Sequence, residues 1–199
     1  MPQPKFFVPE VVQTSEMDCG PASLKALLEG FGIHVSYGRL REACQTQVDG
    51  TSIDTLEEVA VQLGLRAQQV MLPIDHLVLP EAHALPALVV VMLPNGLTHF
   101  VVVWNAVGPF LQIMDPGKGR RWTTWESFAK ELFIHAYAVE ASAWNAWARG
   151  AGLLNPLKRR LRDLDIADAD MASLIELALN DATWQRLAAL DAATRLVTS

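Results

Sequence analysis

The sequence predicts an α+β fold, because helical patterns fill the first half of the chain and strand patterns the second. Apolar residues recur at helical spacing from Leu24 to Phe31. Valine-rich runs of strand length follow at Ala87–Leu93 and Leu97–Val103. The order of these patterns indicates N-terminal helices packed on an antiparallel sheet.

Three helices are predicted in the first half of the chain, with signals at their ends. Gly20-Pro21 starts the first, and the capping pattern Thr51–Asp54 starts the third. Glycines stop both, at Gly30 and Gly64. An extended apolar run, Phe6–Val12, precedes them. The predicted helices span residues 19–30, 36–44 and 53–63.

The second half alternates strand patterns with turn signals. Asn95-Gly96 and Val107–Pro109 are turns, and Thr123–Glu126 has the pattern of a helix cap. In chain order we expect a strand at 66–71, a helical turn at 74–77, strands at 87–93, 97–104 and 110–114, a helix ending at 132, and a last strand at 136–140.

Cys19 lies where the extended run meets the first predicted helix. Unpaired N–H groups and the positive end of the helix dipole favour an anion there, which lowers the pKa of a thiol. A single cysteine is more often a small buried hydrophobe. The positions of His99 at the mouth of one predicted strand and Asp115 at the end of the next favour a reactive thiol instead.

The hairpin between these two strands places His99 near Asp115. If its turn centres on Val107, the two residues lie directly opposite each other, with Cβ atoms about 5 Å apart. The carboxylate would then orient the imidazole and raise its basicity. A register slip of one residue would instead put the two side chains on opposite faces.

Together with Gln13, these residues resemble the C39 peptidase family, the papain-like domain at the N-terminus of ABC transporters that process and export bacteriocins and lanthipeptides. The resemblance covers residues 5–141. It implies that Cys19 is the nucleophile, His99 the general base, Asp115 the group that orients His99, and Gln13 the oxyanion-hole donor. The matching stretches are Gln13–Leu27, Asp49–Ser52, Leu97–Val103 and Asp115–Gly119.

The resemblance implies a cysteine endopeptidase of papain-like fold that cleaves leader peptides after a double-glycine motif. Its partners would be a precursor peptide with an amphipathic helical leader and the transmembrane and nucleotide-binding domains of an ABC transporter. Two alternatives remain open: a non-catalytic cargo-docking module of an exporter, and a stand-alone cysteine hydrolase or acyl-transferase.

Composition and charge argue against nucleic-acid binding, a disulfide-stabilised fold and a membrane span. A net charge of −6 argues against nucleic-acid binding, and two cysteines make no disulfide framework. The longest apolar stretch, Ala84–Leu93, is too short to span a membrane, for which about 20 residues are needed. With no secretory signal pattern, we expect a cytoplasmic protein, at the inner face of the membrane if it belongs to a transporter.

No cofactor is expected. The chain has no phosphate-binding glycine loop, so ATP would bind only to a transporter portion outside it. The histidines other than His99 have no partners at metal-ligand spacing, so we expect no metal site. These histidines are His34, His76, His83 and His135.

The chain changes character after the predicted peptidase domain, residues 1–141. Residues 142–199 are expected to form a helical extension of two or three helices. A basic cluster, Lys158–Arg162, precedes several aspartates. It fits either a connector near a membrane surface that leads toward a transporter core, or a solvated helical appendage.

Overall fold

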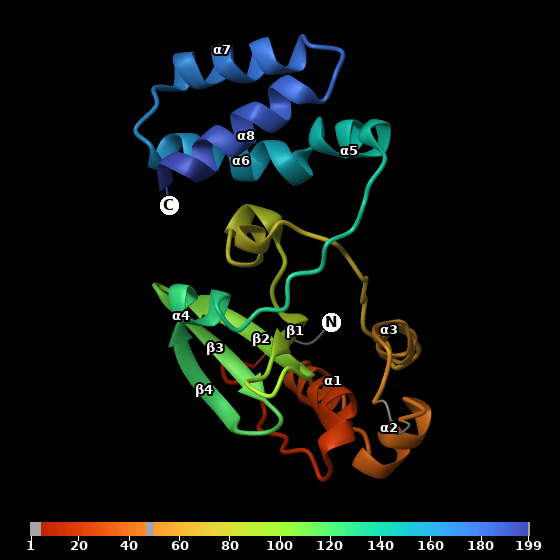
Figure 1. Ribbon diagram of the computed structural model, residues 1–199. Helices are drawn as coiled ribbons and strands as arrows, with labels where there is room; N and C mark the ends of the chain where they lie inside the picture. The colour runs from red at the N-terminus through yellow and green to blue at the C-terminus, as the bar shows by residue number, and fades with distance from the viewer. Residues whose placement is uncertain (1–4, 47–49, 199) are drawn as a thin grey trace. The chain divides into compact units, whose positions relative to one another are not determined.

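The computed structural model describes residues 5–46 and 50–198 and divides the chain into two compact units. The sheet unit comprises Met1–Val78 and Ala84–Ile134, and the helical unit comprises Leu79–His83 and His135–Ser199. Figure 1 shows the strands and helices of each unit. The expected domain boundary after residue 141 stays a prediction.

The sheet unit has the predicted α+β order. Four strands form one antiparallel sheet in the order β1-β2-β3-β4, and α1 lies beside β2 and β3 (Figure 1). Its elements are a 3₁₀ turn η1 (Glu16–Asp18), α1 (Cys19–Gly30), α2 (Tyr37–Ala43), α3 (Ile53–Gln62), a second 3₁₀ turn η2 (Ile74–Leu77), β1 (Ala87–Met92), β2 (Thr98–Val107), β3 (Phe110–Asp115), β4 (Gly119–Thr124) and α4 (Trp125–Ala129).

One face of the sheet packs on α1. Small residues of the helix, Ala22 and Ala26, lie against Val102 and Trp104 of β2 in a buried cluster. Their small side chains let the helix axis approach the sheet closely. This contact fixes the N-terminus of α1, and with it Cys19, relative to β2.

The opposite face of the sheet has its own core. Val101 and Val103 of β2 pack with Ile113 of β3 and with the fully buried Phe128 of α4. Valine and isoleucine suit strands buried on both faces. Because both faces of β2 are covered, its position in the sheet is firmly determined.

Two predicted strands are wrong and one strand was missed. Residues 66–71 and 136–140 pair with no strand among the described residues. The free edge of β1 is instead met by Leu132, which forms a single bridge with Val91. The missed strand is β4, whose polar sequence lacks the apolar pattern of a strand. It forms a hairpin with β3, and Asp115 and Gly119 are the paired residues next to the turn.

In its described part, which ends at residue 198, the helical unit contains four helices rather than the expected two or three. Leu153, Leu157 and Leu161 form the centre of its core. The helices are α5 (Ala141–Ala148), α6 (Ala151–Asp163), α7 (Asp168–Leu179) and α8 (Gln185–Thr198), and a 3₁₀ turn, η3 (Pro80–Ala82), also belongs to this unit.

Part of the basic cluster forms ion pairs with acidic residues of the same helical unit. Arg160 is buried and forms an ion pair with Asp191, and Arg159 pairs with Asp163. The cluster is therefore not simply a solvated face. Within residues 5–46 and 50–198, no helix is both long enough and apolar enough to cross a membrane.

The contact between α1 and Trp104 makes Gly30 sensitive to substitution. A Cβ atom at Gly30 would overlap the Trp104 ring, whereas one at Gly38 of α2 would meet nothing within 4 Å. We expect Gly30→Ala to lower the free energy of unfolding by about 1 to 3 kcal/mol. Gly38→Ala, the control, should raise it by about 0.5 to 1 kcal/mol. Urea denaturation of both variants measures the difference, and equal effects would contradict the packing described.

Candidate active site

Cys19 is the first residue of α1 and is partly exposed. The residue before it, Asp18, occupies the helix N-cap but makes no capping hydrogen bond with its side chain. The first N–H groups of α1 are therefore not engaged by a cap, and the Gly20 N–H lies against the Cys19 sulfur, where it lowers the thiol pKa. This is the helix N-terminal placement that the sequence predicted.

His99 and Asp115 form a buried hydrogen-bonded pair. The Nε2 atom of His99 lies 2.9 Å from Oδ1 of Asp115, and the two residues are 6% and 3% exposed. The same Asp115 oxygen accepts the backbone N–H of Gly117 at 2.9 Å. Since Nε2 is used by Asp115, Nδ1 is the ring nitrogen left to meet the thiol.

The register of β2 and β3 differs from the predicted one. The loop is Gly108-Pro109, and an irregularity between Val103 and Asn105 shifts the register so that Val102 pairs with Met114. If this register continues for one more residue, Asp115 lies opposite Val101. Val101 is two positions from His99 along β2. The predicted direct pairing is wrong, but the offset of two keeps both side chains on one face as diagonal neighbours.

The thiol, imidazole and carboxylate are electrostatically coupled. Burial raises the pKa of Cys19, but the hydrogen bond to His99 and the Phe100 and Gly20 backbone groups outweigh it, so the net pKa is lowered. Burial lowers the pKa of His99, yet hydrogen bonds to Asp115 and Cys19 raise it to about 9. The arrangement favours a thiolate beside an imidazolium.

Asp115 stays ionised in this buried position. Burial raises its carboxyl pKa, and the hydrogen bonds from His99 and the Gly117 N–H lower it below its usual value. Lys118, 3.9 Å from the other carboxylate oxygen, acts in the same direction. Sequence analysis did not single out Gly117, although the Asp-Pro-Gly turn was a visible signal.

Gln13 is anchored to the turn that follows Asp115. Its backbone N–H donates to the Pro116 carbonyl at 2.9 Å. The side-chain Oε1 is buried and has no hydrogen-bond partner in the described part of the chain. The structure thus brings Gln13 to the turn that follows Asp115, with the side-chain carbonyl oxygen left without a hydrogen bond among the described residues.

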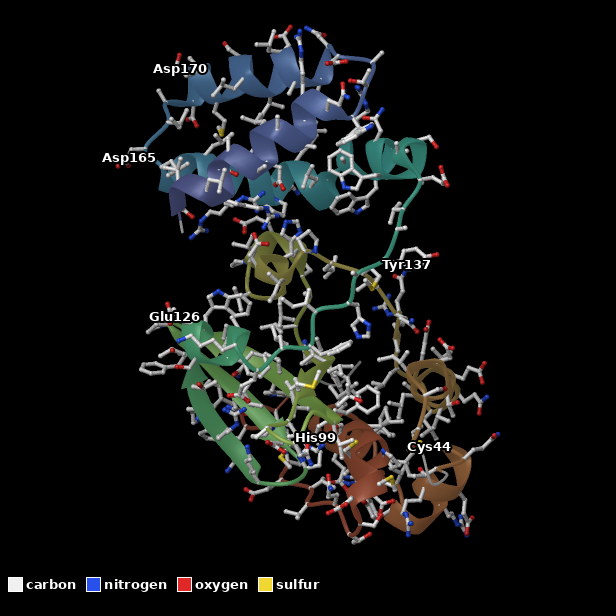
Figure 2. The ribbon with its side chains drawn as sticks, in the orientation of Figure 1. Cys44, His99, Glu126, Tyr137, Asp165 and Asp170 are labelled. Carbon is white, nitrogen blue, oxygen red and sulfur yellow. The ribbon has the colours of Figure 1, made fainter. Side chains whose placement is uncertain are left out.

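The remaining cysteine and histidines lie outside this group. Cys44 is buried, which raises its thiol pKa to about 11, and Figure 2 shows it beside α2, away from His99. No cluster of three or more His, Cys, Asp or Glu side chains suited to a metal occurs among the described residues. Asp49, part of one matching stretch, lies outside the described residues.

The coupling predicts that the His99 pKa depends on the Asp115 charge. We expect Asp115→Asn to lower the His99 pKa toward its ordinary value, because the raised value depends on the hydrogen bond and charge of the carboxylate. Titration of the imidazole Cε1 proton by NMR measures it. The exposed Asp54→Asn is the matched control and should leave the titration unchanged. An unshifted His99 in Asp115→Asn would show that Asp115 does not set its basicity.

Comparison with known proteins agrees with this geometry. The chain is 31% identical over 121 residues to the lactococcin-G-processing and transport ATP-binding protein of Lactococcus lactis subsp. lactis, and 34% identical over 121 residues to the pediocin PA-1 transport/processing ATP-binding protein of Pediococcus acidilactici. The matches cover 61% and 60% of this chain but 17% of each relative, so the chain spans only a small part of their length.

The fold is shared with a solved structure. A double glycine motif protease from an AMS/PCAT transporter, solved in complex with the leader peptide, superposes with a TM-score of 0.55 at 24% identity. The superposition covers 66% of this chain and 88% of that protease, which identifies the sheet-and-helix arrangement as papain-like. The profile of the peptidase C39 family matches residues 8–139. The chain therefore belongs to the peptidase C39 family.

Proposed function

We propose that this chain is a cysteine endopeptidase that removes leader peptides from ribosomally made precursors by cleavage after a double-glycine motif. The observation that carries the proposal is the thiol of Cys19 at the helix N-terminus, electrostatically coupled to His99, which is hydrogen-bonded in turn to Asp115. The relatives are named as processing and transport proteins, which supports a peptide substrate.

Each residue of the group has one role in the proposed reaction. The Cys19 thiolate attacks the carbonyl carbon of the scissile bond, and His99 gives its proton to the departing amine. The resulting acyl-enzyme is hydrolysed by water, with His99 as general base. Asp115 holds the imidazole in orientation and stabilises its protonated form.

The oxyanion formed during attack needs neutral donors. The Gln13 amide and the N–H of Cys19 fit this need, because neither adds a charge to the site. The position of Gln13 supports this role, because its backbone N–H is hydrogen-bonded to the carbonyl of Pro116, in the turn that directly follows Asp115. No cofactor enters the proposed chemistry.

Substrate choice would follow from shape near Cys19. A narrow cleft there would accept two glycines and reject larger side chains by overlap, which discriminates strongly. The leader would bind as an amphipathic helix on an apolar groove. In this proposal the chain acts on the cytoplasmic side of a membrane, with the transmembrane and nucleotide-binding domains of an ABC transporter as its partners.

The nucleophile is tested by Cys19→Ala. We expect the variant to lose cleavage of double-glycine precursors while it keeps their affinity, because leader binding is expected to depend on contacts away from the thiol. Mass spectrometry of the products and fluorescence anisotropy of a labelled leader measure the two. Cys44→Ala is the control. Cleavage that persists in Cys19→Ala would remove Cys19 from the mechanism. If the unaltered chain itself binds precursors but does not cleave them, the result would support a docking module.

The oxyanion role is tested by Gln13→Ala. A donor that acts only in the transition state affects kcat, so we expect a fall of about 10² to 10³ in kcat with little change in KM. The exposed Gln62→Ala at the end of α3 is the control. Steady-state kinetics on a synthetic precursor, with circular dichroism to verify folding, distinguish the outcomes. An unchanged kcat would leave the oxyanion to backbone donors.

The pH dependence of kcat/KM follows from the two shifted groups. Activity should rise at a pH below the ordinary range for a cysteine, because the Cys19 pKa is lowered, and fall near pH 9, where His99 loses its proton. A profile that keeps rising beyond pH 10 would contradict the thiolate–imidazolium pair.

A further inference from the structure

Asp18 occupies a position at which an aspartate usually caps a helix. Such a side chain accepts hydrogen bonds from the first N–H groups of the helix and places its charge at the positive end of the dipole. Asp18 does not, although it directly precedes Cys19 and is 0% exposed. Its carboxylate is directed elsewhere.

Two side chains hold that carboxylate. Arg41 of α2 donates from Nε to Oδ1 at 2.8 Å, and Thr14 donates from its hydroxyl to Oδ2 at 2.8 Å. The Asp18 backbone N–H meanwhile closes η1 by donating to Ser15 at 3.1 Å. Each oxygen of a fully buried carboxylate therefore has its own donor.

The consequence concerns the charge beside Cys19. A buried, unpaired carboxylate adjacent to a thiol raises the thiol pKa, since the two negative charges repel. A carboxylate that capped α1 would also occupy the N–H groups available to the thiolate and the oxyanion. The pairing with Arg41 places a positive charge against this carboxylate and, with Thr14, holds its oxygens away from these N–H groups.

The other groups around Cys19 come from the sheet, from α2 and from the neighbourhood of Gly20. From the sheet, His99 and the backbone of Phe100 lower the pKa of Cys19, and Asp115 and Lys118 form their own ion pair beyond His99. Tyr37 of α2 is kept neutral, because burial and then the negative charge of Asp18 raise its pKa. The neighbours of Gly20, which are Thr51 and Leu56, carry no charge.

We propose that Arg41 is a positioning residue of the C39 site: with Thr14, it holds and neutralises the Asp18 carboxylate so that the N-terminus of α1 stays free for the Cys19 thiolate and the oxyanion. The inference rests on the proposed function for its catalytic consequence. Its electrostatic consequence does not, because it concerns the reactivity of the thiol itself.

The test measures thiolate formation without a substrate. The rate of Cys19 alkylation by iodoacetamide is followed against pH by peptide mapping, which separates Cys19 from the buried Cys44. We expect Arg41→Ala to shift the midpoint upward by about one pH unit, because the Asp18 charge is then uncompensated. Asp18→Asn alone should not raise the midpoint, and Arg41→Ala combined with Asp18→Asn should restore it.

This sign difference separates positioning from a merely structural role, in which both single variants would do equal damage and the double variant would be worse. Arg41→Lys should recover part of the shift, and Arg39→Ala, exposed on the same helix, should behave as wild type. If Arg41→Ala fails to fold by circular dichroism, Arg41→Lys and Thr14→Val carry the test, each with a smaller upward shift.

The proposal is overturned by an unchanged midpoint in folded Arg41→Ala, or by a double variant that does not recover. Precursor cleavage gives an independent readout, in which the acidic limb of kcat/KM should move with the alkylation midpoint. Alkylation that shifts as expected in a chain that cleaves no precursor would support the role of Arg41 and contradict the peptidase function.

Discussion

The hydrogen bond between His99 and Asp115 is the interaction on which the rest of the site depends. Both residues are almost fully buried, so little water is available to replace either hydrogen-bonding partner if the other is lost. It keeps the imidazole protonated to about pH 9, and that charge in turn lowers the pKa of Cys19. A thiol at a helix end would be only mildly activated without this neighbour.

The sheet provides the precision that this hydrogen bond needs. His99 and Asp115 belong to adjacent strands, and the one-residue irregularity between Val103 and Asn105 puts them on the same face. The register beside the loop, Val107 with Phe110, would place Asp115 opposite Val102 if it continued without the irregularity. His99 would then face away from Asp115.

Sequence patterns predicted the parts of this fold that depend on local periodicity. Strong helical stripes and glycine stops marked α1, and valine runs marked β1 and β2. They could not predict the irregularity near Trp104, which inserts one residue without altering the apolar pattern. They also missed β4, whose polar residues become a strand only because β3 offers a partner edge.

The side-chain network behind Cys19 was equally invisible in the sequence. Asp18 and Arg41 are separated by 23 positions and meet only because α2 packs against α1. An aspartate before a helix predicts a cap from sequence alone. The long-range ion pair replaces that local preference, which shows how tertiary contacts can reassign a residue with a strong local propensity.

The central claim is that Cys19 attacks the carbonyl carbon after a double-glycine leader. The most direct measurement uses a synthetic leader peptide that ends in Gly-Gly chloromethyl ketone, a group that alkylates a nucleophile positioned at the scissile bond. The account predicts a single covalent adduct, with loss of chloride, mapped by tandem mass spectrometry to Cys19 and abolished by an excess of uncleavable leader. An adduct on Cys44, or none at all under conditions where the leader binds, would contradict it.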